Sequence, residues 1–391
     1  MFLNTLAYAA RMKILVLNPF EMTAATTIRM EQLSRVIARR HKVVFVSYGE
    51  KEARFRRGGI EYILFRKRFA SPFFHFHQMW LKFRACMRED YDLVYISKPL
   101  LWALLPAVLA RMFRKKRFIL DWDEHEYAII SRISKNPLYL WTIGVIERFG
   151  VKRADALIVV SPYLRQLALK WGYNMARIAL VQNGVDPDNF KVIINQKEMR
   201  KKYGVEGRIA MFLGSLRPQF DIDLVIRAMP LVKKEVEDAK FVIVGGGSDK
   251  AYLEKLAKQM GLGSSVVFLG PQPYELVPSL IRMADVVVAP NRRNEMNLSR
   301  SPVKIAEYMA VGTPIVANAV GLAEDMLKDG AGELVYSEAP EEMAEKIVAV
   351  LKNKGLAERL AEKSRERVRR LYTWERLGAI LERFIEDNFI I

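Results

Sequence analysis

The chain has 391 residues, a formal net charge of +18 and 51% hydrophobic residues, which is enough for two domains that each bury a core. Its single cysteine, Cys86, excludes an internal disulfide and any zinc site built from several cysteines. The four histidines show no metal-binding spacing such as HExxH, although His75 and His77 could share one side of a strand. We therefore expect neither a metal site nor a metal cofactor.

The positive charge is concentrated in the first part of the chain. Lysine and arginine outnumber aspartate and glutamate by 26 to 13 in residues 1–150, and by 36 to 31 in the remainder. A basic half favours an anionic partner. Because no nucleic-acid-binding module is apparent, we favour a phosphate-rich substrate or an anionic membrane surface over nucleic acid. A solvated basic face without a partner is the alternative.

No charge-free run reaches the roughly 20 residues that a membrane-spanning helix needs. Residues 1–11 lack the basic start and the full apolar core of a signal peptide, and Met12 reads as a true start. We expect a cytoplasmic protein. Peripheral attachment to the inner face of the membrane is compatible with this expectation.

The first half of the chain alternates strands with helices. Residues 13–18 read as a strand, residues 29–40 have helical spacing, and residues 43–47 read as the next strand. This alternation predicts a parallel sheet with helices on both faces. Further strands are expected at residues 60–65, 92–96, 117–120 and 157–160.

Two stretches of this half combine apolar and basic residues. Residues 73–86 form an expected aromatic-rich helix after Arg66, Lys67 and Arg68, and residues 101–116 form an apolar helix with a basic end. Such helices can lie on a membrane or pack on the sheet.

The strand at residues 117–120 leads into an acidic segment, residues 121–126, that contains His125. In an open α/β sheet the carboxyl ends of the strands face the ligand crevice. Asp123 and His125 are therefore candidate catalytic residues. The alternative is a polar loop that caps neighbouring helices.

The second half begins a new strand–helix series. Residues 183–186 read as an Asn-Gly turn, and the polar residues 191–202 as a linker. A strand at 210–213 leads to Gly214 and Ser215, whose amides could approach a phosphate. A strand at 241–244 leads to Gly245 and two more glycines, which is weak evidence for a nucleotide and more often a tight turn.

Residues 298–320 read as a capped helix followed by a buried strand. Ser301 is the expected N-cap and Pro302 the first helical residue. The free N–H groups at the helix start, together with Lys304, predict an anion site that suits a diphosphate. Glu307 lies further into the helix, where it can accept hydrogen bonds from a ribose. An ordinary surface helix is the alternative. The expected donor-binding residues here also include Ser299, Arg300 and Val303.

The chain resembles the GT-B-fold retaining glycosyltransferases of family four (glycosyl transferases group 1). The resemblance rests on six segments in the right order and spacing, at residues 183–186, 212–216, 241–247, 266–270, 284–290 and 307–317. It implies an α/β fold with two Rossmann-like, doubly wound domains facing across a cleft: an acceptor domain at 12–187 and a nucleotide-sugar domain at 188–372. A C-terminal helix, 373–391, is expected to cross back to the N-terminal domain, with Leu377, Ile380, Leu381, Phe384 and Ile385 on one side.

The resemblance also implies residue roles. Glu307 matches the second glutamate of the family's paired-glutamate motif, which is expected on the ribose. Residues 123–126 resemble the Asp-x-His-Glu segment that places His125 near the transferred sugar. The family needs no metal, because helix N-termini and basic side chains stabilise the leaving diphosphate.

Three positions depart from the family pattern. Ser299 stands eight residues before Glu307, where the first glutamate of the motif is expected. Ser215 and Phe220 occupy the positions of the usual arginine and lysine. Arg217 lies between them and can reach the phosphates from a different position, and Lys304 is expected to take over charge neutralisation.

Together these features predict a retaining transferase that moves a sugar from a nucleoside diphosphate sugar to a lipid-linked or surface glycan. Arg217, Lys304 and the amides of Gly214, Ser215 and 301–304 would stabilise the diphosphate, and His125 would position the sugar. The alternatives are a nucleotide-sugar epimerase of the same fold, an inactive binding subunit, and a basic nucleic-acid binder. The donor sugar and its base stay open.

Overall fold

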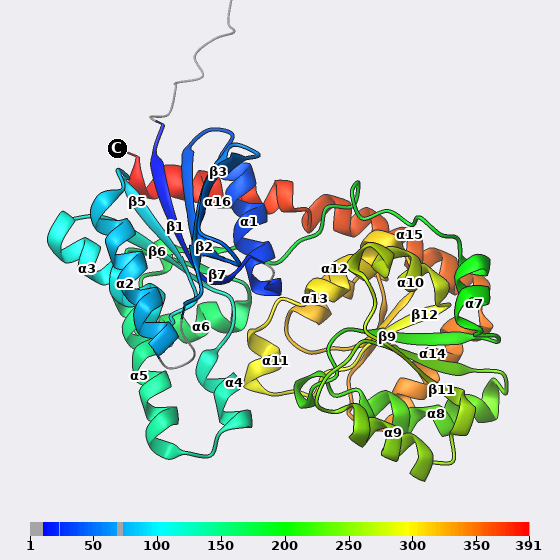
Figure 1. Cartoon of the computed structure of the whole chain (residues 1–391). Coiled ribbons are helices and arrows are strands. Elements are labelled where there is room, and N and C mark those ends of the chain that lie inside the picture. Colours follow the sequence, from blue (N-terminus) through cyan, green and yellow to red (C-terminus); the bar gives the residue numbers. More distant parts are fainter. Residues whose placement is uncertain (1–10, 23, 69–72, 391) are drawn as a thin grey trace, which may run out of the picture. The chain divides into compact units, whose positions relative to one another are not determined.

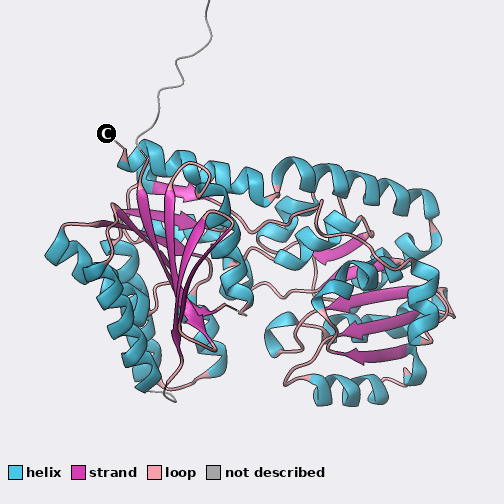
Figure 2. Ribbon diagram, turned by 45° about the horizontal axis from the view of Figure 1, so that its top comes forward, coloured by secondary structure: helices cyan, strands magenta, loops and turns pink. Residues whose placement is uncertain are grey.

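The computed structural model describes residues 11–22, 24–68 and 73–390. The leader at residues 1–10 lies outside the described residues. The chain divides into two compact units (Figure 1): unit 1 holds the described residues up to Gln182 and those from Trp374 onward, and unit 2 is Asn183–Thr373. In each unit, helices cover both faces of one sheet (Figure 2). The predicted α/β class with two Rossmann-like doubly wound sheets is confirmed.

The sheet of unit 1 has eight strands in the order β3-β4-β2-β1-β5-β6-β7-β8. Neighbouring strands are parallel except for β3, which is antiparallel to β4. The strands are β1 (Lys13–Glu21), β2 (Lys42–Gly49), β3 (Ala53–Arg57), β4 (Ile60–Arg66), β5 (Leu93–Ser97), β6 (Arg117–Trp122), β7 (Ala156–Val159) and β8 (Ile178–Leu180).

Both faces of this sheet carry helices. They are α1 (Ala25–Ile37), α2 (Phe73–Arg88), α3 (Leu101–Arg114), α4 (Glu126–Ile133), α5 (Pro137–Arg153), α6 (Pro162–Lys170) and α16 (Trp374–Phe389). Alternate residues of β1 enter opposite cores. Ile14 and Val16 pack with α1 and α16, whereas Leu15 and Leu17 pack with α2, α3, α5 and α6. Because His75 and His77 lie on α2, the idea that they share a strand is wrong.

The last helix, α16, packs against α1 within unit 1. Leu377, Leu381 and Ile385 are fully buried. A Cβ atom added to Gly378 would lie 2.5 Å from Cβ of Val36 on α1, so the backbone of α16 lies directly against that side chain. The buried contact follows the i, i+4 row of the helix. Ile380 lies beside this row and is 39% exposed.

Unit 2 has a six-stranded parallel sheet in the order β11-β10-β9-β12-β13-β14. Its strands are β9 (Ile209–Leu213), β10 (Lys240–Val244), β11 (Val266–Gly270), β12 (Val286–Ala289), β13 (Ile315–Asn318) and β14 (Glu333–Val335). Its helices are α7 (Gln196–Tyr203), α8 (Asp223–Glu235), α9 (Lys250–Gln259), α10 (Val277–Met283), α11 (Glu295–Ser299), α12 (Val303–Val311), α13 (Leu322–Leu327), α14 (Pro340–Lys352) and α15 (Lys354–Leu371).

Two expectations for the start of unit 2 are wrong. Residues 191–202 are no linker, because most of them belong to α7 and its Asn195 N-cap, well inside the unit. Residues 183–186 form no turn. Val185 instead forms a parallel bridge with Thr373, and its N–H donates a hydrogen bond to the Tyr372 carbonyl at 3.0 Å.

None of the described helices is both long enough and apolar enough to cross a bilayer.

Candidate functional site

The start of α12 is held by a partner from the beginning of unit 2. The hydroxyl of Ser301 accepts a hydrogen bond from the Asn183 N–H, and the Ser301 carbonyl accepts one from the Asn183 side-chain amide, both at 2.8 Å. The predicted capping by Ser301 is therefore wrong. The N-cap is Pro302, without a side-chain capping bond, and the helix begins at Val303. The left-handed Gly312, with φ 71°, ends the helix as expected.

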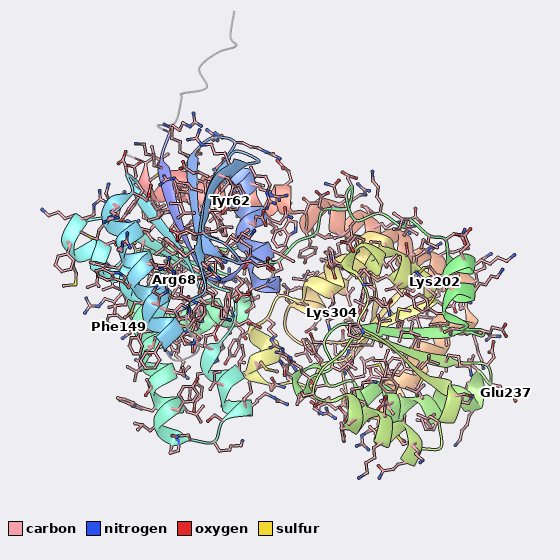
Figure 3. All side chains as sticks on the ribbon, in the orientation of Figure 1. Tyr62, Arg68, Phe149, Lys202, Glu237 and Lys304 are labelled. Atoms are coloured by element: carbon pink, nitrogen blue, oxygen red, sulfur yellow. The ribbon has the colours of Figure 1, made fainter. Side chains whose placement is uncertain are left out.

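Lys304, which is labelled in Figure 3, belongs to the first turn of α12. Its amine lies between two aromatic rings. Its Nζ is 4.1 Å from the ring centroid of Phe212 and 4.1 Å from that of Phe220. Burial, with a further contribution from Arg300, lowers the pKa of Lys304 to about 7. A Cβ atom added to Gly214 would lie 3.0 Å from this Nζ. The amine therefore borders the loop that follows β9.

Gly214 and Gly245 pack two loops against each other. A Cβ atom on Gly245 would lie 1.9 Å from the Gly214 carbonyl oxygen, and Gly245 has φ +136°. The N–H of Gly214 donates to the Val244 carbonyl, and that of Gly245 to the Gly270 carbonyl, both at 2.9 Å. The expectation that the Gly214 amide serves a phosphate is therefore wrong. Both glycines instead allow the close approach of the loops.

Two exposed residues follow Gly214. Ser215 is exposed, and no main-chain carbonyl of the described residues accepts a hydrogen bond from its N–H. Arg217 is also exposed, and its carbonyl accepts a hydrogen bond from the Phe220 N–H at 3.0 Å, within the short 3₁₀ segment Pro218–Phe220. Both side chains are accessible to a ligand.

Glu307 is buried one turn beyond Lys304. The hydroxyl of Tyr274 donates to its Oε1 at 3.0 Å. Burial raises the pKa of Glu307 to about 7, although this hydrogen bond and the charge of Lys304 oppose the shift. Tyr274 is 58% exposed, so the pair presents both a carboxylate and an aromatic ring. No local sequence pattern marks Tyr274 as a site residue.

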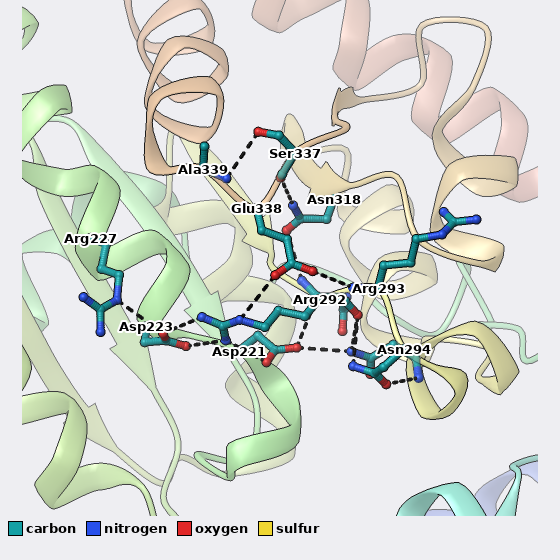
Figure 4. Close-up of polar contacts among 12 residues, drawn as sticks. Asp221, Asp223, Arg227, Arg292, Arg293, Asn294, Asn318, Ser337, Glu338 and Ala339 are labelled. Atoms are coloured by element: carbon teal, nitrogen blue, oxygen red, sulfur yellow. Dashed lines mark hydrogen bonds and ion pairs between the residues drawn. The ribbon is translucent and has the colours of Figure 1, made fainter.

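A charged network orders the neighbouring loops of unit 2 (Figure 4). Asp221, in the left-handed region at φ 49°, accepts hydrogen bonds from the Arg292 N–H at 2.8 Å and the Asn297 side chain at 3.1 Å. The Arg292 guanidinium also pairs with Asp223 at 2.7 Å. This network connects the segment after Phe220 to α11, and its partners are too far apart in the sequence to be predicted from local patterns.

Ser299 is the last residue of α11 and is fully buried. Its hydroxyl donates to the Met296 carbonyl at 2.8 Å. The side chain at the position of the missing glutamate therefore serves the fold of α11.

In unit 1, the carboxyl ends of β5 and β6 carry a buried ionic cluster. Lys98 follows β5 in the left-handed conformation, with φ 60°, and its Nζ lies 3.2 Å from Asp123, 2.6 Å from Glu124 and 2.8 Å from Glu126. Burial opposes the charge of Lys98, but the three carboxylates raise its pKa well above the usual value. Burial raises the pKa of Asp123 to about 6, against the effect of Lys98.

A second buried carboxylate, Glu147 on α5, organises the segment around His125. Its oxygens accept hydrogen bonds from the Trp122 indole at 2.7 Å and from the N–H groups of Glu126 at 2.8 Å and Tyr127 at 3.0 Å. The Nε2 atom of His125 lies 3.7 Å from the same carboxylate. Glu147 therefore holds the start of α4 and one side of the His125 ring.

A buried ion pair lies directly before this segment. Arg29 and Asp121 are paired at 3.1 Å, and the Tyr95 hydroxyl donates to Asp121 at 2.5 Å. The guanidinium also donates to the carbonyls of Val181 and Gln182, both at 2.8 Å. This pair joins α1, β6 and the end of β8.

The structure thus groups the predicted residues within each unit. In unit 2 it brings Lys304 and Arg300 to Phe220 and Gly214. In unit 1 it brings Asp123 and His125 into one buried segment. Lys98 and Glu147 were not among the predicted site residues. The sequence gives only weak indications of their roles: Lys98 directly follows an apolar strand, and Glu147 lies on a largely apolar helix. Within 11–22, 24–68 and 73–390, no three His, Cys, Asp or Glu residues are grouped as a metal site would require.

Comparisons with known proteins agree with this architecture. The model of "Glycosyltransferase Family 4" matches residues 27–189, and that of "Glycosyl transferases group 1" matches residues 195–367. The structure is similar to that of Anabaena Alr3699/HepE in complex with UDP, with a TM-score of 0.73, 15% identity and coverage of 96% of this chain and 100% of that chain. It is also similar to WaaG, a glycosyltransferase involved in lipopolysaccharide biosynthesis, with a TM-score of 0.70, 18% identity and coverage of 95% and 98%.

Curated relatives match a shorter part. An uncharacterised glycosyltransferase of Methanocaldococcus jannaschii is 31% identical over 60% of this chain and 61% of its own length. A GDP-mannose-dependent phosphatidylinositol monomannoside mannosyltransferase of Mycolicibacterium smegmatis is 30% identical over 62% of each chain. The chain thus spans about three fifths of the length of these relatives.

The two Rossmann-like units have the GT-B fold, and each unit matches one glycosyltransferase family model. The chain belongs to the family-four type, with the group 1 domain as its second unit.

Proposed function

We propose that the chain transfers a sugar from a nucleoside diphosphate sugar to an acceptor with retention at the anomeric carbon. The observation that carries the proposal is the position of Lys304. Its amine lies at the start of α12 and borders the Gly214 loop. A cationic side chain beside a helix N-terminus suits the diphosphate of a leaving nucleotide.

The other donor contacts follow from the same helix. In this proposal Glu307, which accepts a hydrogen bond from the Tyr274 hydroxyl, also accepts hydrogen bonds from the ribose hydroxyls. The N–H groups of Val303 and Lys304 and the exposed Ser215 and Arg217 complete the proposed donor site. UDP in the HepE complex and GDP-mannose in the name of the mycobacterial relative support a nucleotide-sugar donor. They leave the base open.

For the reaction we favour front-face attack. The acceptor oxygen bonds to the anomeric carbon as the bond from that carbon to the diphosphate oxygen breaks on the same face. The acceptor proton passes to the leaving phosphate oxygen, so no protein carboxylate acts as nucleophile. Lys304 and Arg217 stabilise the departing charge, without a metal ion. His125, held by Glu147, positions the sugar.

The acceptor side belongs to unit 1, and we propose a lipid-linked or surface glycan, with the enzyme in the cytoplasm and peripheral on the inner face of the membrane. Exposed apolar side chains support this: Phe73 is 70% exposed on α2, and Met112 and Phe113 are 68% and 65% exposed on α3. The basic end of α3 lies beside them. Lys115 and Lys116 are suitable sites to test it, because Arg114 and Arg117 donate to main-chain carbonyls and so support the fold.

Slow donor hydrolysis tests the reaction without knowledge of the acceptor. Wild-type protein is incubated with α-linked UDP- and GDP-sugars, and the first sugar released is observed by NMR. Retention predicts the α anomer first, and the β anomer would refute the mechanism. Conversion of the donor into an isomeric nucleotide sugar would identify an epimerase. An intact donor that also fails to bind would favour an inactive binding subunit.

A further inference from the structure

A basic groove lies in unit 1 between the end of β4 and helix α2. Its polar lining comes from Arg66 at the end of β4, Arg68 just after it, His77 and Arg84 on α2, and Glu52. Trp80, Leu81 and Phe65 supply the apolar lining. The hollow measures about 210 Å³, several times the ~30 Å³ that one water molecule takes up in the liquid. It has room for a polyatomic anion.

The charges that face the groove are unbalanced. Glu52 is its only carboxylate in the described structure, and it lies 3.5 Å from Arg68 with 65% of its side chain exposed. Among the described residues, no carboxylate lies within 4.0 Å of the side-chain nitrogens of Arg66 or Arg84. Burial and the nearby Arg68 lower the pKa of His77, which is the effect expected in a positive field. Two arginines are thus left to bind an external anion.

The chemistry of the lining favours a phosphoryl group. Guanidinium groups bind phosphate oxygens in pairs, with a geometry that a single ammonium does not offer. Trp80, which also lines the groove, is 56% exposed. Phe76 and Phe73 are 64% and 70% exposed. They lie four and seven residues before Trp80, and therefore on the same side of α2. An indole next to basic groups and apolar rings is typical of a membrane–water interface.

The groove lies at the functional edge of its sheet. Strand β4 is parallel to β2, so Arg66 ends it at the same carboxyl edge from which Asp123 follows β6. Four strand spacings separate β4 from β6 in the sheet order, which corresponds to roughly 19 Å. A phosphate in the groove would therefore belong to the part of a ligand that is remote from the reacting sugar.

We propose that this groove is a phosphoryl-binding subsite for the acceptor, with Arg66 and Arg84 as its main ligands. The assignment of the ligand as the acceptor rests on the proposed function, whereas the anion site itself does not. The phosphoryl group belongs either to a lipid headgroup or to a soluble phosphorylated acceptor.

The test compares the double variant Arg66→Gln/Arg84→Gln with the charge-matched pair Lys42→Gln/Arg56→Gln. Lys42 begins β2 at the opposite edge of the sheet, and Arg56 lies on β3, outside the groove lining. One probe is phosphatidylcholine vesicles with phosphatidylglycerol, and the other is inorganic phosphate in a calorimeter. The double variant is expected to bind its probe roughly 30-fold more weakly than the wild type, and the matched pair at most about three-fold.

The two probes distinguish the sources. Vesicle binding that only the groove variant loses supports a lipid phosphate, and phosphate binding lost in the same way without vesicle binding supports a soluble acceptor. Equal weakening by both variant pairs would show a diffuse charge effect and overturn the proposal, as would a wild type that binds neither probe. Titration with UDP- and GDP-sugars in the same samples is expected to be unchanged by the double variant. Absence of nucleotide binding in the wild type would refute the proposed function. The vesicle and phosphate assays would still show whether the groove binds a phosphoryl group.

Discussion

The Nζ atom of Lys304 lies 4.1 Å from the centroid of the Phe220 ring, so the amine stacks on the residue that stands where the family resemblance places a lysine. Phe212 contacts it from a second side at the same distance. A cation held by two ring faces is attracted by their π-electrons and loses much of its hydration. The cation of the donor site is thus supplied by α12, and the loop after β9 contributes an aromatic platform.

The first prediction concerns Lys304 itself. Lys304→Met keeps the apolar stem and removes the charge, so affinity for the nucleotide sugar is expected to fall about 10- to 100-fold, the usual worth of a charged hydrogen bond. Calorimetric titration measures the change. Lys202→Met, on the exposed helix α7 (Figure 3), is the matched control and is expected to bind like the wild type. Unchanged affinity in Lys304→Met would contradict the assignment.

The second prediction is a pH optimum for donor binding near neutrality. The pKa values of Lys304 and Glu307 are both about 7. Above that pH the free Lys304 loses its proton and its attraction for phosphate, and below it Glu307 gains a proton and accepts ribose hydroxyls less well. Affinity should therefore fall on both sides. Lys304→Met should remove the alkaline fall and Glu307→Gln the acid fall. A pH profile that neither variant alters would show that these groups do not control binding.

The third prediction tests the packing of the glycine loops. Gly245→Ala would place a methyl group 1.9 Å from the Gly214 carbonyl oxygen, so one of the two loops must move. The free energy of unfolding should fall by about 3 kcal/mol or more. Donor affinity should fall as well. Gly270→Ala is the control, because Gly270 has φ +70° but nothing within 4 Å of an added Cβ. It should cost only the backbone strain of about 1 kcal/mol. Thermal unfolding measures both, and equal effects would argue against the clash.

The fourth prediction concerns Glu147. Burial raises the pKa of this carboxyl to about 8, above the ordinary 4.5. The folded state therefore binds the proton more tightly than the unfolded state, and the stability that this proton contributes is complete below about pH 4.5 and is lost as the pH rises to about 8. Glu147→Gln cannot titrate. Wild-type stability relative to this variant should thus fall across that window, by at most about 1.4 kcal/mol per pH unit.

Denaturant unfolding at several pH values checks this prediction. A difference that stays constant with pH would mean that the N–H donors of Trp122, Glu126 and Tyr127 keep the carboxylate ionised throughout.

The fold could be predicted from the sequence because its strands are continuous apolar runs separated by helical periodicity. β5 and β7 are buried along their whole length and are typical of a parallel sheet. Strand β3 could not be predicted, because its sequence ARFRR is charged and largely exposed. It is a strand because it pairs with β4.

The site could be predicted only in part, because its supporting contacts are distant in the sequence. Ser301 has the local pattern of an N-cap, yet its hydroxyl is taken by Asn183, 118 residues earlier. Glu147 reaches the start of α4 from 21 residues further along the chain. Local spacing contains no information about either contact. Lys304 and Glu307 were identified because helix position alone brings them near each other.

Calorimetric titration of the wild type and Glu307→Ala with UDP, GDP and their common sugar conjugates tests whether α12 carries a nucleotide-sugar site. We expect that one nucleotide binds tightly to the wild type, which identifies the base, and that the variant binds it at least about ten-fold more weakly. Failure of every nucleotide to bind the folded wild type would contradict the claim.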